Sequence, residues 1–224
     1  NTGAFSWTPS ELQGGGSYTV TITVSDNGTC NLADSETITI TVNEVNVAPV
    51  LTGVPATATI PEEAVYTFDA NVTDADIPAN TLTFSLVGAP AGALIDPVTG
   101  IFSWTPTEAQ GPGSYTFTVK ACDNGTPALC DEETITVTVS EVNKAPVLAP
   151  IGNQTVDELS LLTFTASATD GDLPANTLTY SLVGAPSGAT SDGATGVFRW
   201  TPSETQGPST TTFTVKVVDN GVPA

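Results

Sequence analysis

The sequence repeats itself at intervals of nearly one hundred residues. A Phe-x-Trp-Thr-Pro pattern recurs at intervals of 97 and 96 residues, around Trp7, Trp104 and Trp200. An Asp-Asn-Gly triplet recurs in the same register, beginning at Asp26, Asp123 and Asp219. Self-similarity at a fixed period indicates tandem copies of one structural unit. The chain must therefore adopt a fold of about 100 residues that can be joined end to end.

The repeats define three segments. One complete copy runs from residue 47 to residue 143. Residues 1–46 match the C-terminal part of such a copy, and residues 144–224 match a copy that lacks its last strand. We expect these boundaries to separate the domains, because about 100 residues is a common domain size. We also expect the chain to be a segment of a longer tandem array.

Each copy has the alternating pattern of β-strands. In residues 17–25, apolar Tyr18, Val20, Ile22 and Val24 alternate with Thr and Ser, and residues 134–139 alternate in the same way. A period of two gives each strand one buried and one exposed face. Turns rich in Gly, Pro, Asn and Asp separate these short strands. This pattern predicts an all-β protein built from tandem Greek-key β-sandwiches.

The charge balance excludes several classes of function. The chain has 24 acidic residues against four basic ones, a net charge of −20, and no histidine. Such a surface repels nucleic acid and anionic lipid. No apolar run approaches the ~20 residues of a membrane-spanning helix, so we expect no membrane insertion within these residues. Without histidine there is no Ser-His or Cys-His pair, and the acidic pairs recur at equivalent repeat positions. We therefore predict a protein that is not an enzyme.

Cys122 and Cys130 flank a loop between two predicted strands. They could form a disulfide, which would fit an oxidising, extracellular compartment, or remain as free thiols. The residues alone leave both alternatives open.

The repeated tryptophans also have two interpretations. Phe102 and Trp104 are two residues apart on a predicted strand, so their side chains face the same side. Phe5 with Trp7, and Phe198 with Trp200, have the same spacing. This spacing favours packing in the core over a stacking platform for a carbohydrate, which would require exposed tryptophans.

An acidic phrase occurs twice in the chain, as TDADIPAN from Thr73 and as TDGDLPAN from Thr169. Two aspartates separated by one residue after a strand present two carboxylates together, which is unfavourable unless a cation lies between them. Calcium prefers carboxylate, amide and carbonyl oxygens, and the asparagine of each phrase could supply one. The alternative is a solvated turn, for which Asp, Asn and Pro are ordinary residues.

The residues around these phrases resemble the cadherin repeat. Glu62 and Glu158 match a glutamate near the end of the first cadherin strand, and the linkers EVNVAP and EVNKAP, residues 44–49 and 141–146, are similar to the cadherin linker. ACDNGTP and VVDNGVP match a further cadherin element. The phrase D-P-x-T-G-x-F-x-W-T-P is typical of dystroglycan-type cadherin-like domains and of the He-PIG Ig-like repeats of large bacterial or archaeal surface proteins.

The resemblance implies Ca²⁺ at the junctions between repeats. It implies a first set of ligands comprising Glu44, Asn46, Asp74, Asp76, Asn80 and Asp123. It implies a second set comprising Glu62, Glu141, Asn143, Asp170, Asp172, Asn176 and Asp219. Glu11 and Glu108 lie near a further ligand position, where the local sequence departs from the cadherin motif.

The expected function is that of a non-enzymatic, extracellular or cell-surface array. Its junctions would be stiffened by calcium, and it would serve as a stalk or filament segment of a surface protein. Further repeats or other copies of the same protein are the expected partners. The alternative is an adhesive module that binds a cell-surface glycan or protein directly through loops at a domain end.

Overall fold

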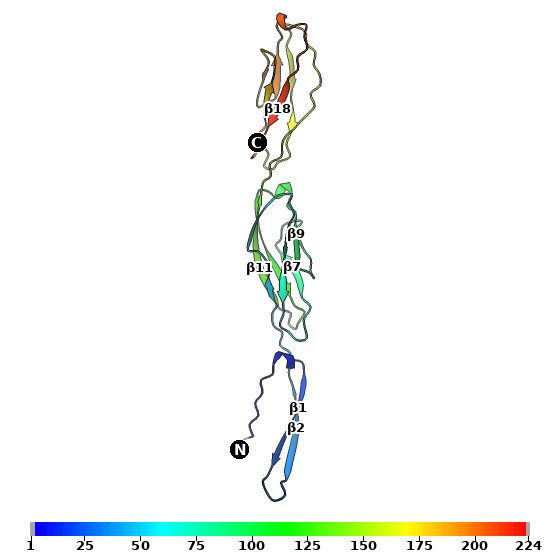
Figure 1. Cartoon of the computed structure of the whole chain (residues 1–224), viewed down its shortest axis with the longest axis vertical. Coiled ribbons are helices and arrows are strands. Elements are labelled where there is room, and N and C mark those ends of the chain that lie inside the picture. The colour runs from blue at the N-terminus through cyan, green and yellow to red at the C-terminus, as the bar shows by residue number, and fades with distance from the viewer. Residues whose placement is uncertain (1–2, 223–224) are drawn as a thin grey trace. The chain divides into compact units, whose positions relative to one another are not determined.

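The computed structural model describes residues 3–222 of the chain (Figure 1). Within that range the regular structure consists of β-strands and three short 3-10 helices. The all-β prediction is therefore confirmed. The chain divides into two compact units, one comprising Asn1–Ala58, Tyr66–Trp104 and Tyr115–Val137, and the other comprising Thr59–Val65, Thr105–Ser114 and Thr138–Ala224.

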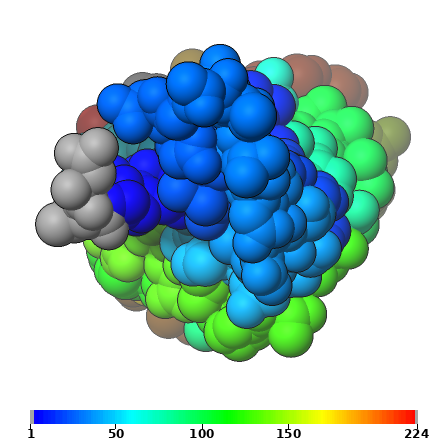
Figure 2. All heavy atoms as spheres, turned by 90° about the horizontal axis from the view of Figure 1, so that it is seen from below, coloured from blue at the N-terminus to red at the C-terminus, as the bar shows by residue number. Residues whose placement is uncertain are grey.

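The first segment folds as a β-hairpin preceded by a 3-10 helix, η1 (Glu11–Gln13). Its strands β1 (Ser17–Ser25) and β2 (Ala33–Thr41) pair antiparallel along their whole length. Facing threonines extend the pairing through their side chains, as between Thr21 Oγ1 and Thr37 Oγ1 at 2.9 Å. Figure 2 shows the surface of this hairpin in blue, with the residues that precede it in darker blue.

The middle segment contains nine strands and one 3-10 helix. In chain order they are β3 (Val50–Thr52), β4 (Thr57–Pro61), β5 (Tyr66–Asp69), β6 (Asn71–Thr73), β7 (Thr83–Val87), β8 (Leu94–Ile95), β9 (Ile101–Trp104), η2 (Glu108–Gln110), β10 (Gly113–Cys122) and β11 (Cys130–Ser140). They form one sheet in the order β4-β11-β10-β7, a second in the order β5-β9-β8, and a short β3-β6 ladder.

Aromatic side chains fill the core of the first unit. Phe102 stacks on Phe68 with ring centroids 4.5 Å apart and on Phe117 at 5.3 Å. Trp104 is 1% exposed and meets Tyr115 edge to face at 5.1 Å. The prediction that the tryptophan faces the core with its phenylalanine is confirmed for this copy.

The last segment repeats this arrangement with fewer strands. Its elements are β12 (Val147–Leu148), β13 (Leu162–Thr165), β14 (Ala168–Thr169), β15 (Thr179–Val183), β16 (Thr190–Ser191), β17 (Val197–Trp200), η3 (Glu204–Gln206) and β18 (Thr214–Val218). Phe198 lies between Phe164, at 4.6 Å, and Phe213, at 5.1 Å. The core is thus built from the same positions, although Trp200 is only half-buried.

The turn before β9 accounts for the Asp-Pro-x-Thr-Gly phrase. Asp96 Oδ1 accepts hydrogen bonds from the backbone N–H groups of Val98 and Thr99, at 2.9 and 2.7 Å. Gly100 has φ +75°, and a Cβ at this position would collide with the carbonyl oxygen of Ala70. The turn therefore requires glycine, and Gly196 has the same geometry in the last segment.

Cys122 and Cys130 form a disulfide, so the first of the two alternatives holds. The bond joins the end of β10 to the start of β11. It closes a loop of sequence separation eight. Cross-links that close loops of this length typically stabilise a fold by about 2–3 kcal/mol.

Phe5 and Phe102 occupy equivalent repeat positions but differ in burial, which gives a matched test of the core. Phe102 is 0% exposed and Phe5 is 53% exposed. Phe102→Ala should reduce the free energy of unfolding of the middle segment by about 3–5 kcal/mol, because it leaves a cavity between two stacked rings. Phe5→Ala should change it by less than about 1 kcal/mol. Urea denaturation monitored by tryptophan fluorescence measures both, and equal effects would contradict this description of the core.

Candidate metal centres

The first D-x-D phrase folds as a turn that places one carboxylate inside the end of the domain. Asp74 Oδ1 accepts a hydrogen bond from the backbone N–H of Asp76 at 2.9 Å. The carboxylate of Asp76 is turned inward, and the residue is 5% exposed. The backbone N–H of Val47 in the linker donates to both of its oxygens, at 3.1 and 3.2 Å.

Two asparagines connect this turn to the Asp-Asn-Gly turn. Asn80 Nδ2 donates to Asp76 Oδ2 at 2.6 Å and to Asn46 Oδ1 at 2.9 Å. Asn46 Nδ2 in turn donates to Asp123 Oδ2 at 3.0 Å. A hydrogen-bonded chain of side chains therefore links the D-x-D phrase, the linker and the Asp-Asn-Gly turn.

Asp123 is held as a carboxylate by its own turn. Burial raises its pKa, but hydrogen bonds from the N–H groups of Leu129 and Gly125 and from Asn46 outweigh burial, and the pKa lies below its ordinary value. A Cβ on Gly125 would overlap the Asn46 amide. The glycine of the Asp-Asn-Gly turn is thus required because the linker asparagine packs against it.

The second copy repeats this network in the second unit. Asp172 N donates to Asp170 Oδ1 at 3.1 Å, and Asn176 Nδ2 donates to Asp172 Oδ2 at 2.8 Å and to Asn143 Oδ1 at 2.9 Å. Asn143 Nδ2 donates to Asp219 Oδ1 at 3.0 Å. The same residue types at the same repeat positions therefore build the same geometry twice.

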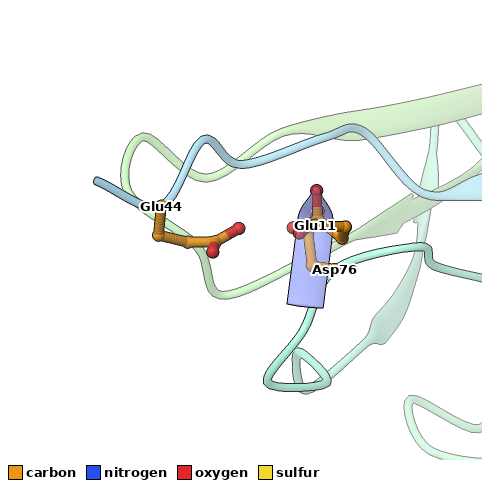
Figure 3. Close-up of side chains that lie close together, drawn as sticks. All are labelled: Glu11, Glu44 and Asp76. Carbon is orange, nitrogen blue, oxygen red and sulfur yellow. The ribbon is translucent and has the colours of Figure 1, made fainter. Parts of the chain in front are cut away.

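A first acidic cluster, defined as Glu11, Glu44 and Asp76, lies beside the first network (Figure 3). Each contributes a carboxylate oxygen within 4.8 Å of the other two. Glu11 is positioned by η1, whose capping pattern includes a hydrogen bond from Ser10 N to Gln13 Oε1 at 2.9 Å. Loss of water around the Glu44 carboxylate and the adjacent charges of Glu11 and Asp76 raise the Glu44 pKa.

A hollow of about 270 Å³ opens beside this cluster. Its lining comprises Glu44, Asn46, Asp76, Pro78, Asn80, Gly125 and Thr126. Four of the predicted first set of ligands thus line one polar hollow.

A second acidic cluster, defined as Glu62, Glu108 and Glu141, lies in the second unit with the same 4.8 Å spacing of oxygens. Glu62 is 2% exposed, and its Oε1 accepts a hydrogen bond from Val142 N at 3.0 Å. Its Oε2 and both carboxylate oxygens of Glu141 are buried without a hydrogen-bond partner. Burial, together with the charges of Glu62, Glu108 and Asp172, raises the pKa of Glu141.

Sequence reasoning missed Lys144 and Glu63. Lys144 Nζ lies 2.9 Å from Glu63 Oε1 and 2.9 Å from Glu108 Oε2. A comparison of the two linkers could have drawn attention to Lys144, because the equivalent position of the first linker is Val47.

Some of the predicted ligands lie within the two acidic clusters. Others lie outside the clusters and belong to the hydrogen-bonded networks beside them. Glu11 and Glu108, considered as additional candidates, lie within the clusters. Five aspartates that were predicted as ligands are outside the two clusters, namely Asp74, Asp123, Asp170, Asp172 and Asp219. Of these, Asp74 and Asp170 each keep one buried oxygen, Oδ2, without a hydrogen-bond partner.

The donor set fits a hard divalent cation. Within the two clusters all the candidate ligand atoms are carboxylate oxygens, and the amide oxygens of Asn46 and Asn143 lie in the adjoining networks. Buried oxygens without a hydrogen-bond partner are costly, and neighbouring carboxylates repel one another. Ca²⁺ is stabilised by six to eight such oxygens. The same atoms would be poor ligands for softer metals, which prefer sulfur or imidazole.

Comparison with known proteins gives one family match. The He_PIG family model, described as "Putative Ig domain", matches residues 48–140 and again residues 145–222. Human Protocadherin Fat 1 is 34% identical over 148 residues, which are 62% of this chain and 3% of that protein. The Serine-rich adhesin for platelets of Staphylococcus aureus (strain MRSA252) is 30% identical over 149 residues, 66% of this chain and 10% of that protein.

A likeness among solved structures supports the same fold. The crystal structure of Drosophila N-cadherin EC1-4 aligns with a TM-score of 0.52 and 18% identity, covering 95% of this chain and 56% of that one. The chain spans only a small part of the curated relatives that it matches. Residues 3–222 contain no helix with the length and apolar character needed to cross a membrane. The family model thus matches two successive repeats, and the two relatives are named as a protocadherin and an adhesin.

The raised pKa of Glu141 gives a pH-dependent prediction. A carboxyl whose pKa is raised in the folded state contributes stability that is full below its ordinary value of 4.5 and is lost as the pH rises through the raised value. Glu141→Gln keeps the neutral form at every pH. It should therefore raise the melting temperature of the metal-free protein at pH 7 by a few degrees, and the difference should disappear near pH 4.

Scanning calorimetry in EDTA measures this effect. Glu133→Gln is the control, because Glu133 is exposed on β11 and lies outside both clusters. A Glu141→Gln protein that is no more stable than the control at pH 7 would show that the crowding of charges does not cost stability.

Proposed function

This chain belongs to the Putative Ig domain family, and we propose that its repeats form a calcium-stiffened, non-enzymatic segment of an extracellular stalk or filament. In this proposal residues 47–143 are one complete repeat. Residues 1–46 are the C-terminal part of the preceding repeat, and residues 144–224 are a following repeat without its last strand. Its partners are further repeats or other copies of the same protein.

One observation carries the proposal: Glu62 and Glu141 keep buried carboxylate oxygens without a hydrogen-bond partner, beside a third carboxylate. Folding removes these groups from water and places like charges together, and both effects are unfavourable. The second acidic cluster is therefore a site at which the folded chain requires positive charge. A divalent cation would remove both penalties at once.

Residues on both sides of each linker would hold the ion. At the first cluster these are Glu11, Glu44 and Asp76, with Asn46, Asn80, Asp74 and Asp123 in the adjoining network. At the second they are Glu62, Glu108 and Glu141, with Asn143, Asn176, Asp170, Asp172 and Asp219. Bound calcium supplies charge neutralisation and coordination to oxygens that would otherwise repel one another.

The mechanical consequence follows from where these residues lie in the chain. Glu11 precedes the first linker, Glu44 belongs to it, and Asp76 follows it. A cation held by all three fixes the linker to the segments on either side. Without the cation, repulsion between the same groups loosens the linker, so calcium would control the stiffness of the array.

We expect the full chain to bind calcium, and removal of one buried aspartate from each network to weaken that binding. The double variant Asp76→Asn/Asp172→Asn should raise the apparent dissociation constant for calcium by about tenfold or more, since fewer charged ligands remain. The matched control is Glu36→Gln/Glu133→Gln, which makes the same change of charge at two equivalent, exposed repeat positions. Isothermal titration calorimetry measures both.

Small-angle scattering from the calcium-free and the calcium-saturated protein tests the proposed effect of calcium on the stiffness of the array. The wild-type radius of gyration should change on calcium addition, with a narrower distribution of shapes, and the double aspartate variant should respond at higher calcium only. Absence of calcium binding at millimolar concentration, or equal effects of the two double variants, would refute the proposal.

A further inference from the structure

The two acidic networks differ at one linker position. The linkers read EVNVAP and EVNKAP, so Val47 in the first corresponds to Lys144 in the second. The backbone N–H of each residue donates to the buried aspartate, Asp76 or Asp172, with nearly equal distances. The backbone role is thus the same, and only the side chain differs.

The Lys144 ammonium lies at the edge of the second acidic cluster. Its Nζ is 2.9 Å from Glu63 Oε1 and 2.9 Å from Glu108 Oε2. The Glu108 side chain is 17% exposed, so this ion pair is partly shielded from water. Glu108 Oε1 also accepts a hydrogen bond from Leu173 N at 2.9 Å. Each carboxylate oxygen of Glu108 therefore already has one partner within the chain.

Glu11, the counterpart of Glu108, has a different environment. It accepts one long hydrogen bond, from Ile77 N at 3.4 Å, and the ion pairs found among residues 3–222 do not involve it. The pKa of Glu108 is lowered, chiefly by the hydrogen bond from Lys144 and then by that from Leu173. In both clusters a neighbouring glutamate has a raised pKa, Glu44 beside Glu11 and Glu141 beside Glu108.

We propose that Lys144 is a built-in cation of the second acidic cluster, which partly neutralises the cluster without metal and competes with calcium for Glu108. The competition with calcium rests on the proposed function. It makes the two junctions unequal: the first depends on added calcium for its positive charge, whereas the second keeps part of its order when calcium is withdrawn.

The alternative interpretation is that the contact between Lys144 and Glu108 is an ordinary surface ion pair without a role in metal binding. Lys120 provides that comparison, because its Nζ lies 2.8 Å from Glu132 Oε1. The two pairs differ in their carboxylates, since the Glu132 side chain is 52% exposed and that of Glu108 is 17% exposed. Surface ion pairs of this kind contribute little to stability. The difference between Lys144 and Lys120 is that only Lys144 shares a carboxylate with a candidate metal site.

Reciprocal substitutions test the inference in the full chain. Lys144→Val reproduces the first linker in the second, and Val47→Lys does the reverse. Each is made in a background that weakens the other site, Asp76→Asn for Lys144→Val and Asp172→Asn for Val47→Lys. Lys120→Val, which removes the same charge from an ion pair outside the clusters, is the control for each.

Calorimetric titration should show that Lys144→Val tightens calcium binding by roughly tenfold, the size expected for removing one positive charge near a divalent ion. Val47→Lys should weaken calcium binding at the first cluster by a similar factor. In EDTA, Lys144→Val should lower the melting temperature of the second unit more than Lys120→Val does, because the cluster loses its only ammonium among the described residues.

The outcomes separate the two proposals. If the wild-type chain binds calcium but Lys144→Val and Lys120→Val have equal affinities, the role of Lys144 is overturned and the proposed function stands. If no variant binds calcium, the proposed function fails and the competition fails with it. An unchanged melting temperature of Lys144→Val in EDTA would overturn the neutralising role on its own.

Discussion

Repulsion between carboxylates that folding brings together is the constraint on which both candidate sites depend. Glu62 and Glu141 are placed side by side with buried oxygens that have no hydrogen-bond partner, and the pKa of Glu141 is raised as a result. The fold does not relieve this repulsion by moving the residues apart, because Glu62 is fixed through its other oxygen to Val142 N. A metal ion, or an ammonium such as that of Lys144, is the kind of group that lowers the energy of this arrangement.

The neutral part of each network explains how the acidic residues are held in place. Asn80 and Asn46 connect Asp76 to Asp123, and Asn176 and Asn143 connect their counterparts. These amides donate to carboxylate oxygens of Asp76 and Asp123 and of their counterparts, whereas the buried oxygens without a hydrogen-bond partner belong to Glu62, Glu141, Asp74 and Asp170. Glycine in each Asp-Asn-Gly turn makes room for the linker asparagine. A recurring turn sequence thus has a packing role in addition to its conformational one.

Much of this organisation could be predicted from sequence because it is local or repeated. The alternation of residues 17–25 predicted β1, the spacing of Phe102 and Trp104 predicted their shared burial, and the repeated acidic phrases indicated Asp76 with Asn80. Other features depend on contacts between distant segments. The partners of Lys144 are 81 and 36 residues away, so its ion pairs could not be read from the linker. The hydrogen bond from Asp76 N to Asp74 Oδ1 was also not predicted, because it depends on the conformation of the turn.

The most direct test of the central claim is long-wavelength diffraction from crystals of the full chain grown with calcium. The account predicts anomalous peaks at about 2.3–2.6 Å from carboxylate oxygens of Glu62 and Glu141 in the second cluster, and of Glu44 and Asp76 in the first. Well-ordered carboxylates with no anomalous peak at millimolar calcium would contradict it, because the buried oxygens would then be tolerated without a metal ion.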